Sequence, residues 1–291
     1  MFKKYAMDKK IPYLLILPSV AGFLCFYFLP FLSSVYFSLV NNNFDKEFAG
    51  FANYAALFKN EFFMMALKNT LIYMAVSIPV LVALTFAVSL LIFNMKSAAI
   101  RAGVVFLISI PLVIPSATLS FFWSNIFSTN GWLNSLLFNF DTNYIPVDHF
   151  NSGNAMWIMI LIFFYKNLGY NIILFTAGLN VLDSSCFEAA KVDGANTRQI
   201  MAHITLPLMK PVFIVTVLMS IINSFKVFKE VYMIYGNYPD ESVYNIQFFL
   251  NNMLNKLQFQ SLTAASTVTT LVISLAVTLL LMNSHKGERL G

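Results

Sequence analysis

The sequence predicts an all-α, polytopic membrane protein, and three observations favour that fold class: the composition, the long apolar runs and the placement of the charges. Of the 291 residues, 58% are hydrophobic and only 11% are charged. Soluble domains carry about 25% charged residues, so the deficit excludes an ordinary globular core. The net charge of +5 is small, and we attribute it to membrane topology and not to nucleic-acid binding.

Six apolar segments are each long enough for a helix to cross the hydrocarbon core, which takes about 20 residues. They cover residues 12–40, 69–94, 102–127, 155–178, 211–236 and 263–283. Prolines inside them, such as Pro111 and Pro115 in the third, are expected to kink the helices. The first run is too long for a signal peptide, so we expect it to be an uncleaved span. The sequence therefore predicts six transmembrane helices in a single domain over residues 1–291.

The basic residues of the loops predict the orientation. If the N-terminus is inside the cell, eleven of the eighteen Lys and Arg residues fall in cytoplasmic segments and four fall outside. The eleven are Lys3, Lys4, Lys9, Lys10, Lys96, Arg101, Lys191, Arg198, Lys210, Lys286 and Arg289, and the four are Lys46, Lys59, Lys68 and Lys256. Cytoplasmic loops are the ones enriched in Lys and Arg, so both termini are predicted to be cytoplasmic.

The polar segment 184–211 separates the fourth and fifth spans and is predicted to hold two short helices. Ser185 and Glu188 are spaced as a capping box, which predicts a helix over residues 186–192. Gly194 is then expected to supply the backbone freedom for a sharp turn. Capping boxes are common, so Glu188 and Gly194 alone indicate a capped helix and a turn and nothing more.

A second cap pair opens the next helix of this segment. Asn196 and Gln199 have the spacing of an N-cap and its partner at the third helical position. Pro207 and Pro211 are expected to end that helix and to begin the fifth span. The segment would then be two helices hinged at Gly194, near the membrane surface.

Ionisable side chains within the predicted spans are the second unusual feature, because charges inside a bilayer usually face a cavity or a partner. Lys166 lies in the fourth span, and Asn223, Lys226 and Glu230 share one face of the fifth. Two interpretations compete. Lys226 and Glu230 form a local pair one helical turn apart, or the polar stripe lines a transport pathway.

The longer string around Glu188 resembles a known loop. Glu188-Ala-Ala, Asp193-Gly-Ala and Ile204-Thr-Leu-Pro-Leu occur in register, as in permeases of binding-protein-dependent ABC importers of the carbohydrate, maltose-type branch. Weaker similarities lie at residues 50–54, 111–116, 131–134 and 168–170, while Tyr235-Gly-Asn-Tyr-Pro239 departs from the family's Gly-Gly-Pro turn. The resemblance implies a type I importer permease fold, in which this loop grips a separate ATPase subunit.

The resemblance also implies roles for individual residues. ATPase coupling would be carried by Glu188, Ala189, Ala190, Asp193 and Gly194. By register with the sugar-contacting helices of maltose-type permeases, the substrate pathway would be lined by Leu112, Ser116, Tyr165, Lys166, Gly169, Asn223 and Lys226. Taken alone, Tyr165 is better explained as a packing aromatic, as most aromatic residues in helices are.

The same resemblance implies the assembly. A second permease, two ATPase subunits that bind ATP and Mg, and an extracytoplasmic solute-binding protein would surround this chain in a bacterial inner or plasma membrane. The chain has no phosphate-binding Gly-x-x-x-x-Gly-Lys-Ser/Thr loop and no catalytic constellation, so we expect neither enzyme activity nor a cofactor of its own. Its two cysteines and three histidines show no metal-ligand spacing.

The predicted function is import of a sugar or oligosaccharide, with alternatives left open. The cargo could be a glycerol phosphate or an acidic sugar. In a different class, an ion-coupled secondary transporter would use Lys166, Lys226 and Glu230 as its relay. A non-transporting membrane scaffold is a third interpretation, which the buried polar stripe disfavours.

Overall fold

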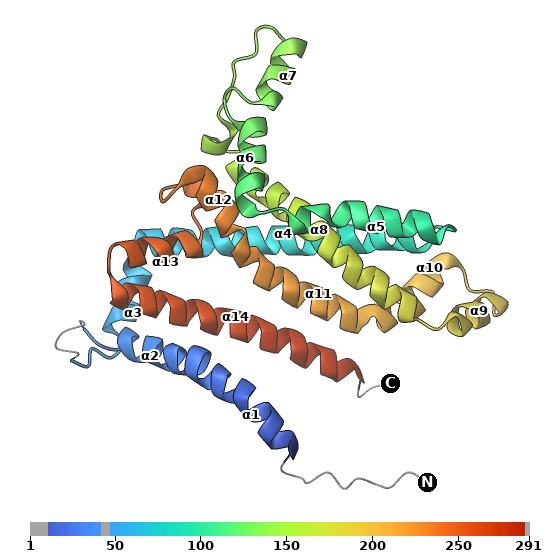
Figure 1. The fold of residues 1–291 in the computed structure, drawn as a ribbon, viewed down its shortest axis with the longest axis horizontal. Coiled ribbons are helices and arrows are strands. Elements are labelled where there is room, and N and C mark those ends of the chain that lie inside the picture. The colour runs from blue at the N-terminus through green and yellow to red at the C-terminus, as the bar shows by residue number, and fades with distance from the viewer. Residues whose placement is uncertain (1–10, 42–46, 289–291) are drawn as a thin grey trace. The chain divides into compact units, whose positions relative to one another are not determined.

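The computed structural model describes residues 11–41 and 47–288, and these form helices joined by short connections (Figure 1). Five helical segments are long and apolar enough to cross a membrane, and a bent helix pair makes six if it counts as one span. Between Val40 and Phe48 lies an isolated β-bridge. The all-α membrane fold predicted from the sequence is confirmed.

The chain divides into two compact units, the first comprising residues 1–63 with 252–272 and the second comprising residues 64–251 with 273–291. The first unit holds α1 (Ile11–Phe23), a π turn (Leu24–Phe28), α2 (Leu29–Ser38) and α3 (Ala52–Lys59). Its polar contacts centre on Asn53, whose amide donates to the carbonyls of Ser38 and Val40 at 2.9 and 2.7 Å. The side chains of Tyr13–Ser38 are almost entirely unburied, as expected for a helix that faces lipid or another subunit.

The second unit contains most of the remaining helices. They are α5 (Ala98–Val113), α6 (Ser116–Phe127), α7 (Trp132–Phe140), α8 (Ala155–Val181), α9 (Ser184–Val192), α10 (Thr197–Ile200), α11 (Leu206–Lys226) and α12 (Phe228–Tyr235). Three helices have residues in both units: α4 (Glu61–Phe93), α13 (Ile246–Asn255) and α14 (Phe259–Glu288). Short 3₁₀ turns occur at His149–Asn151 and Glu241–Val243.

The centre of the second unit is α8, which packs against α5 and α11. Its glycines allow close approach. A Cβ at Gly169 would lie 2.5 Å from the carbonyl oxygen of Ile108 in α5, and one at Gly178 would lie 2.7 Å from a methyl of Val212 in α11. Small residues at such contacts are typical of helix pairs in membranes, where packing takes over from the hydrophobic effect. Gly169 therefore serves the α5–α8 contact.

Apolar and polar contacts together hold α4, α8 and α11. The buried apolar cluster comprises Ile78, Val82, Phe86, Phe175, Leu179, Met209 and Ile221. Beside it, the Asn171 amide donates to Ser220 Oγ at 3.1 Å and the Ser89 hydroxyl donates to the Ile172 carbonyl at 3.4 Å. Hydrogen bonds of this kind add about 0.6 kcal/mol each between membrane helices, so the packing of the apolar cluster contributes most of the stability.

The third predicted span, 102–127, is two helices and not one. The pair formed by α5 and the segment Ser116–Phe140 is bent by 96° at Ile114 and Pro115. Proline disfavours the helical conformation of the residue before it, and Ile114 is extended, with ψ of 130°. The proline that was expected to kink this span instead breaks it.

The fifth span also differs from the prediction. Helix 197–200 continues through a π turn (Met201–Thr205) directly into α11. Pro207 lies in the first turn of α11, where a missing N–H is tolerated, so Pro207 and Pro211 do not end the preceding helix as expected. Further on, α11 and α12 are separated by the single residue Val227, whose backbone stays helical (φ −61°, ψ −20°), so Thr197–Tyr235 is one long span.

Candidate functional site

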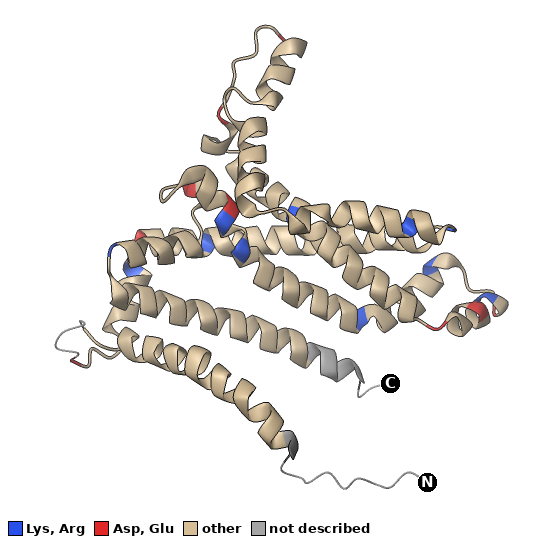
Figure 2. Cartoon of the chain, in the orientation of Figure 1, with Lys and Arg blue, Asp and Glu red and all other residues tan. Residues whose placement is uncertain are grey.

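A cavity of about 240 Å³ lies in the second unit, beside the bend between α5 and α6. Its lining comprises Leu112, Ser116, Phe163, Lys166, Asn167, Asn223, Lys226, Val227 and Lys229. These residues come from the end of α5, the start of α6, the middle of α8, and the helical span that α11 and α12 form together. Figure 2 shows charged residues sparse along the long helices and gathered near the start of α12.

A buried carboxylate organises one wall of this cavity. The Glu230 side chain is completely buried, and its Oε1 accepts a hydrogen bond from Ser116 Oγ at 2.6 Å and forms a salt bridge with Lys166 Nζ. Lys166 Nζ also donates to Ser116 Oγ at 3.0 Å, and Ser120 Oγ donates to the Glu230 carbonyl oxygen at 3.0 Å. The network therefore ties α12 to α6 and α8.

This pairing corrects the structural interpretation of the polar stripe. Sequence spacing pairs Glu230 with Lys226 one turn away, but the partner of Glu230 is Lys166 from α8. Lys226 and Glu230 lie on one helical span, but the Glu230 carboxylate is engaged by Lys166 of α8 and Ser116 of α6 instead. Lys226 instead lines the cavity with an exposed side chain.

Five of the seven predicted pathway residues line this cavity, and two do not. Leu112, Ser116, Lys166, Asn223 and Lys226 are brought together. Tyr165 instead lines a separate pocket beside α5 and packs edge-on against Trp123, with ring centroids 5.3 Å apart. Gly169 lies buried against the backbone of Ile108.

Helix geometry explains which residues of α8 reach the cavity. At about 100° per residue, positions 163, 166 and 167 fall on one face of α8. Position 165 falls on the opposite face, and position 169 falls to the side that packs against α5. The spacing i, i+3, i+4 of Phe163, Lys166 and Asn167 could have identified Phe163 and Asn167 from the sequence. The same spacing of Asn223, Lys226 and Val227, with Lys229 three residues after Lys226, could have identified Val227 and Lys229.

The loop around Glu188 forms a second, exposed candidate site. Its first helix, α9, begins at Ser184 and not at Cys186, and its N-cap is Asp183, whose carboxylate accepts from the Ser185 backbone N–H at 2.9 Å. The predicted Ser185–Glu188 capping box is therefore wrong. The hydrogen bonds from Ser185 lower the pKa of the Asp183 carboxyl. Because Asp183 caps the helix, Glu188 takes no part in capping, and its side chain is exposed.

The turn after α9 is a Schellman motif at Gly194. The backbone N–H of Gly194 donates to Lys191 O at 3.1 Å, and that of Ala195 donates to Ala190 O at 2.9 Å. Gly194 has φ of +82°, a conformation that only glycine adopts without strain. The next helix opens with a complete capping box between Asn196 and Gln199, as the sequence predicts.

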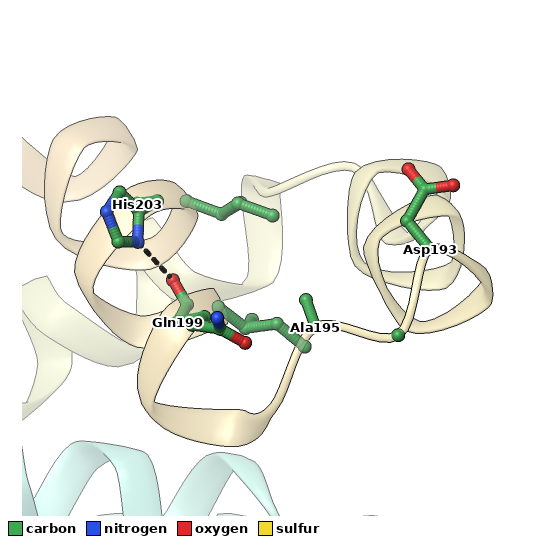
Figure 3. Close-up of a pocket in the computed structure, with 7 residues that line it drawn as sticks. Asp193, Ala195, Gln199 and His203 are labelled. Carbon is green, nitrogen blue, oxygen red and sulfur yellow. Dashed lines mark hydrogen bonds between the residues drawn. The ribbon is translucent and has the colours of Figure 1, made fainter.

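Between the two short helices lies an open groove of about 330 Å³, shown in Figure 3. Asp193 and Gly194 line its α9 side, while Gln199, Ile200 and His203 line the other. Of the predicted coupling residues, Asp193 and Gly194 face this groove, and Glu188 and Ala189 are exposed on α9. Ala190 is half-buried. Across the described ranges, no cluster of three His, Cys, Asp or Glu could hold a metal ion.

The fold and these two sites fit a membrane permease, and comparisons with known proteins agree. The family described as binding-protein-dependent transport system inner membrane component matches residues 49–286. The chain belongs to this family of transport permeases.

Relatives of this chain cover nearly its whole length. The arabinooligosaccharides transport system permease protein AraP of Bacillus subtilis is 31% identical, over 96% of this chain and 91% of that protein. The trehalose/maltose transport system permease protein MalF of Thermococcus litoralis is 26% identical, over 97% and 96%. A crystal structure of a bacterial ABC transporter that imports the acidic polysaccharide alginate has a chain with TM-score 0.82 and 22% identity, covering 94% of this chain and 95% of that one.

The pairing of Glu230 is tested by double-mutant cycles on the purified protein in detergent. Glu230→Gln and Lys166→Gln should each lower thermal stability, because each leaves one buried partner uncompensated, at a cost of about 3 kcal/mol. The double variant should lose less stability than the two single variants lose in sum, and the difference is a coupling free energy of about 1–3 kcal/mol.

Lys226→Gln provides the matched control for this cycle. Combined with Glu230→Gln, it should be additive within about 0.5 kcal/mol, because Lys226 does not contact the carboxylate. A coupling free energy between Glu230 and Lys226, without one between Glu230 and Lys166, would contradict the observed network.

Proposed function

We propose that this chain is one of two permease subunits of an ATP-driven importer, and that its cargo is a sugar or oligosaccharide. The observation that carries the proposal is the polar cavity beside the bend between α5 and α6, which α8, α11 and α12 also line. Discontinuous helices at membrane depth are tolerated only where they are buried in protein or line a cavity. A chain of this family with such a cavity is therefore expected to pass cargo along it.

The lining of the cavity supports a saccharide. Ser116, Asn167 and Asn223 offer hydroxyl and amide groups, which can both donate to and accept from sugar hydroxyls. Named relatives transport arabinooligosaccharides, lactose and trehalose or maltose, and another transports sn-glycerol 3-phosphate. A second, similar permease subunit would form the other half of the pathway.

The remaining partners of the proposed assembly follow from the chain's own surfaces. The exposed α9 would dock on an ATPase subunit that binds ATP and Mg, with Glu188 facing a basic group there. Gly194 would let α9 turn relative to the next helix. A solved relative is in complex with an alginate pentasaccharide-bound periplasmic protein, which supports an extracytoplasmic binding protein as the source of cargo here too.

The ion-coupled alternative receives less support. A proton or sodium relay through Lys166, Lys226 and Glu230 needs these groups in contact. Glu230 is engaged by Lys166 and Ser116, and Lys226 has no carboxylate partner in the described part of the chain. Membership of a binding-protein-dependent family also favours an ATPase as the motor.

Coupling through Glu188 tests the proposal. Proteoliposomes that hold the complete complex should take up labelled arabino- or maltooligosaccharides with ATP, even after ion gradients are collapsed. Glu188→Lys should reduce that uptake at least about tenfold, which corresponds to a loss of about 1.4 kcal/mol at the docking surface. The level of the permease in the membrane should stay normal, because Glu188 is exposed and makes no packing contact that folding needs.

Asp141→Lys is the matched control, since Asp141 is another exposed acidic residue, at the end of α7. It should leave uptake unchanged. An active ATPase complex that copurifies with the Glu188→Lys variant and transports normally would contradict the docking role. Uptake that persists without ATP and needs a proton or sodium gradient would contradict the importer itself.

We also propose that the chain is a multi-pass protein of a bacterial inner or plasma membrane with both termini cytoplasmic, on the basis of the distribution of Lys and Arg. Single cysteines at Asn143 and Asn196, both exposed positions, test the orientation once Cys25 and Cys186 are replaced by serine. A thiol reagent that cannot cross membranes should label only the cysteine at position 143 in spheroplasts. Labelling of position 196 alone would invert the topology.

A further inference from the structure

The charges that line the cavity do not cancel. Three lysines, Lys166, Lys226 and Lys229, contribute to its lining. Glu230 is the carboxylate beside it, and Glu230 is engaged by Lys166. Three formal positive charges less one negative charge leave two positive charges, on Lys226 and Lys229.

These two lysines have no protein partner in the described part of the chain. No carboxylate pairs with either ammonium group, and both side chains are exposed. They lie on the two sides of Val227, one at the end of α11 and one at the start of α12. Both lysines line the same cavity, because positions i and i+3 of one helical span lie near each other.

An uncompensated ammonium group at membrane depth is costly, and such groups normally mark a substrate or ion path. A long lysine side chain can avoid the cost by reaching a lipid headgroup. Here both lysines line the same enclosed space as Asn223 and Ser116. The cationic groups therefore share a surface with the amide and the hydroxyl that can bind sugar hydroxyls, which favours cargo over lipid as the source of negative charge.

We propose that Lys226 and Lys229 form an anion-binding subsite in the cavity and that the cargo is an acidic saccharide, bearing carboxylate, sulfate or phosphate groups. The inference rests on the proposed function as an importer and adds the class of substrate. Lys166 does not take part directly, because Glu230 and Ser116 engage its ammonium group. Glu230 holds Lys166 in its position, while Lys226 and Lys229 bind the anionic group of the cargo.

Pairs of probes that differ only in charge test this proposal. The probes are short oligogalacturonates, oligomannuronates and glucuronate-bearing xylooligosaccharides, each with its carboxyl-reduced neutral form. Uptake is measured in proteoliposomes that hold the complete complex and its binding protein. The wild-type complex should import at least one acidic member and should prefer it to its neutral form.

Two substitutions then assign the preference to the lysines. The double variant Lys226→Gln, Lys229→Gln should raise the half-saturating concentration of the acidic probe at least about tenfold, as expected for the loss of charge-assisted hydrogen bonds. It should change that of the neutral form by less than about threefold, since the change removes charge, keeps a polar side chain and leaves Asn167 and Asn223 in place. Lys226→Arg with Lys229→Arg keeps the charge and should retain the preference for the acid.

The controls separate binding from folding and from the binding protein. Lys59→Gln removes an exposed lysine in the last turn of α3 and should change nothing. Because a binding protein could impose its own preference, ATPase stimulation by the acidic probe is also measured in a binding-protein-independent reconstitution at high probe concentration. Complex yield and melting temperature of each variant must match the wild type.

The results that would contradict the proposal are distinct. Import of neutral probes only would overturn the acidic cargo while the importer function stands. Import of an acidic probe that both glutamine substitutions leave unchanged would overturn the role of the lysines. Import of neither set by vesicles that take up arabino- or maltooligosaccharides with ATP would overturn this inference alone, whereas uptake of none of these sugars would overturn the proposed function with it.

Discussion

The salt bridge between Glu230 and Lys166 is the interaction on which the rest of the cavity depends. A carboxylate without exposure to solvent is strongly destabilising unless it is paired and hydrogen-bonded, and Glu230 has both an ammonium and a hydroxyl on one oxygen. Because its partners come from α8 and α6, the short helix α12 can occupy only a narrow range of positions. The pair thus holds α12 against the start of α6, where the bent span turns.

The bend itself has a local cause. Pro115 forces Ile114 out of the helical conformation, and the pair of helices is bent by 96° there. The bend places Ser116, at the start of α6, within hydrogen-bond distance of Lys166 in α8. The fifth span supplies its part of the lining without such a bend, because Asn223, Lys226 and Lys229 are three residues apart on one helical span.

Local features of the fold were predictable from the sequence where one local interaction decides them. Gly194 and the pair Asn196–Gln199 behave as predicted, because a positive φ and a capping box involve only neighbouring residues. The cap of α9 was assigned wrongly because Asp183 stands two positions before Ser185 and supplies the carboxylate that caps the helix.

Long-range features of the site were harder to predict. The partner of Glu230 lies on another helix, and sequence spacing can suggest only partners on the same one. Tyr165 and Gly169 were placed in the pathway by resemblance, yet Tyr165 lies on the face of α8 away from the cavity and Gly169 packs closely against α5. Which face of a helix meets a cavity depends on the neighbouring helices, and these are fixed only by the assembled fold.

The most direct test of this account is the chemical accessibility of neighbouring positions on α11 in the assembled complex. Single cysteines replace Asn223, which lines the cavity, and Ile222, which is exposed outside it, in a background without Cys25 and Cys186. A charged, hydrophilic thiol reagent should modify the cysteine at position 223 and not the one at position 222, and cargo should protect position 223. Equal labelling of both positions, or no protection by cargo, would contradict a water-filled cargo pathway beside the bend between α5 and α6.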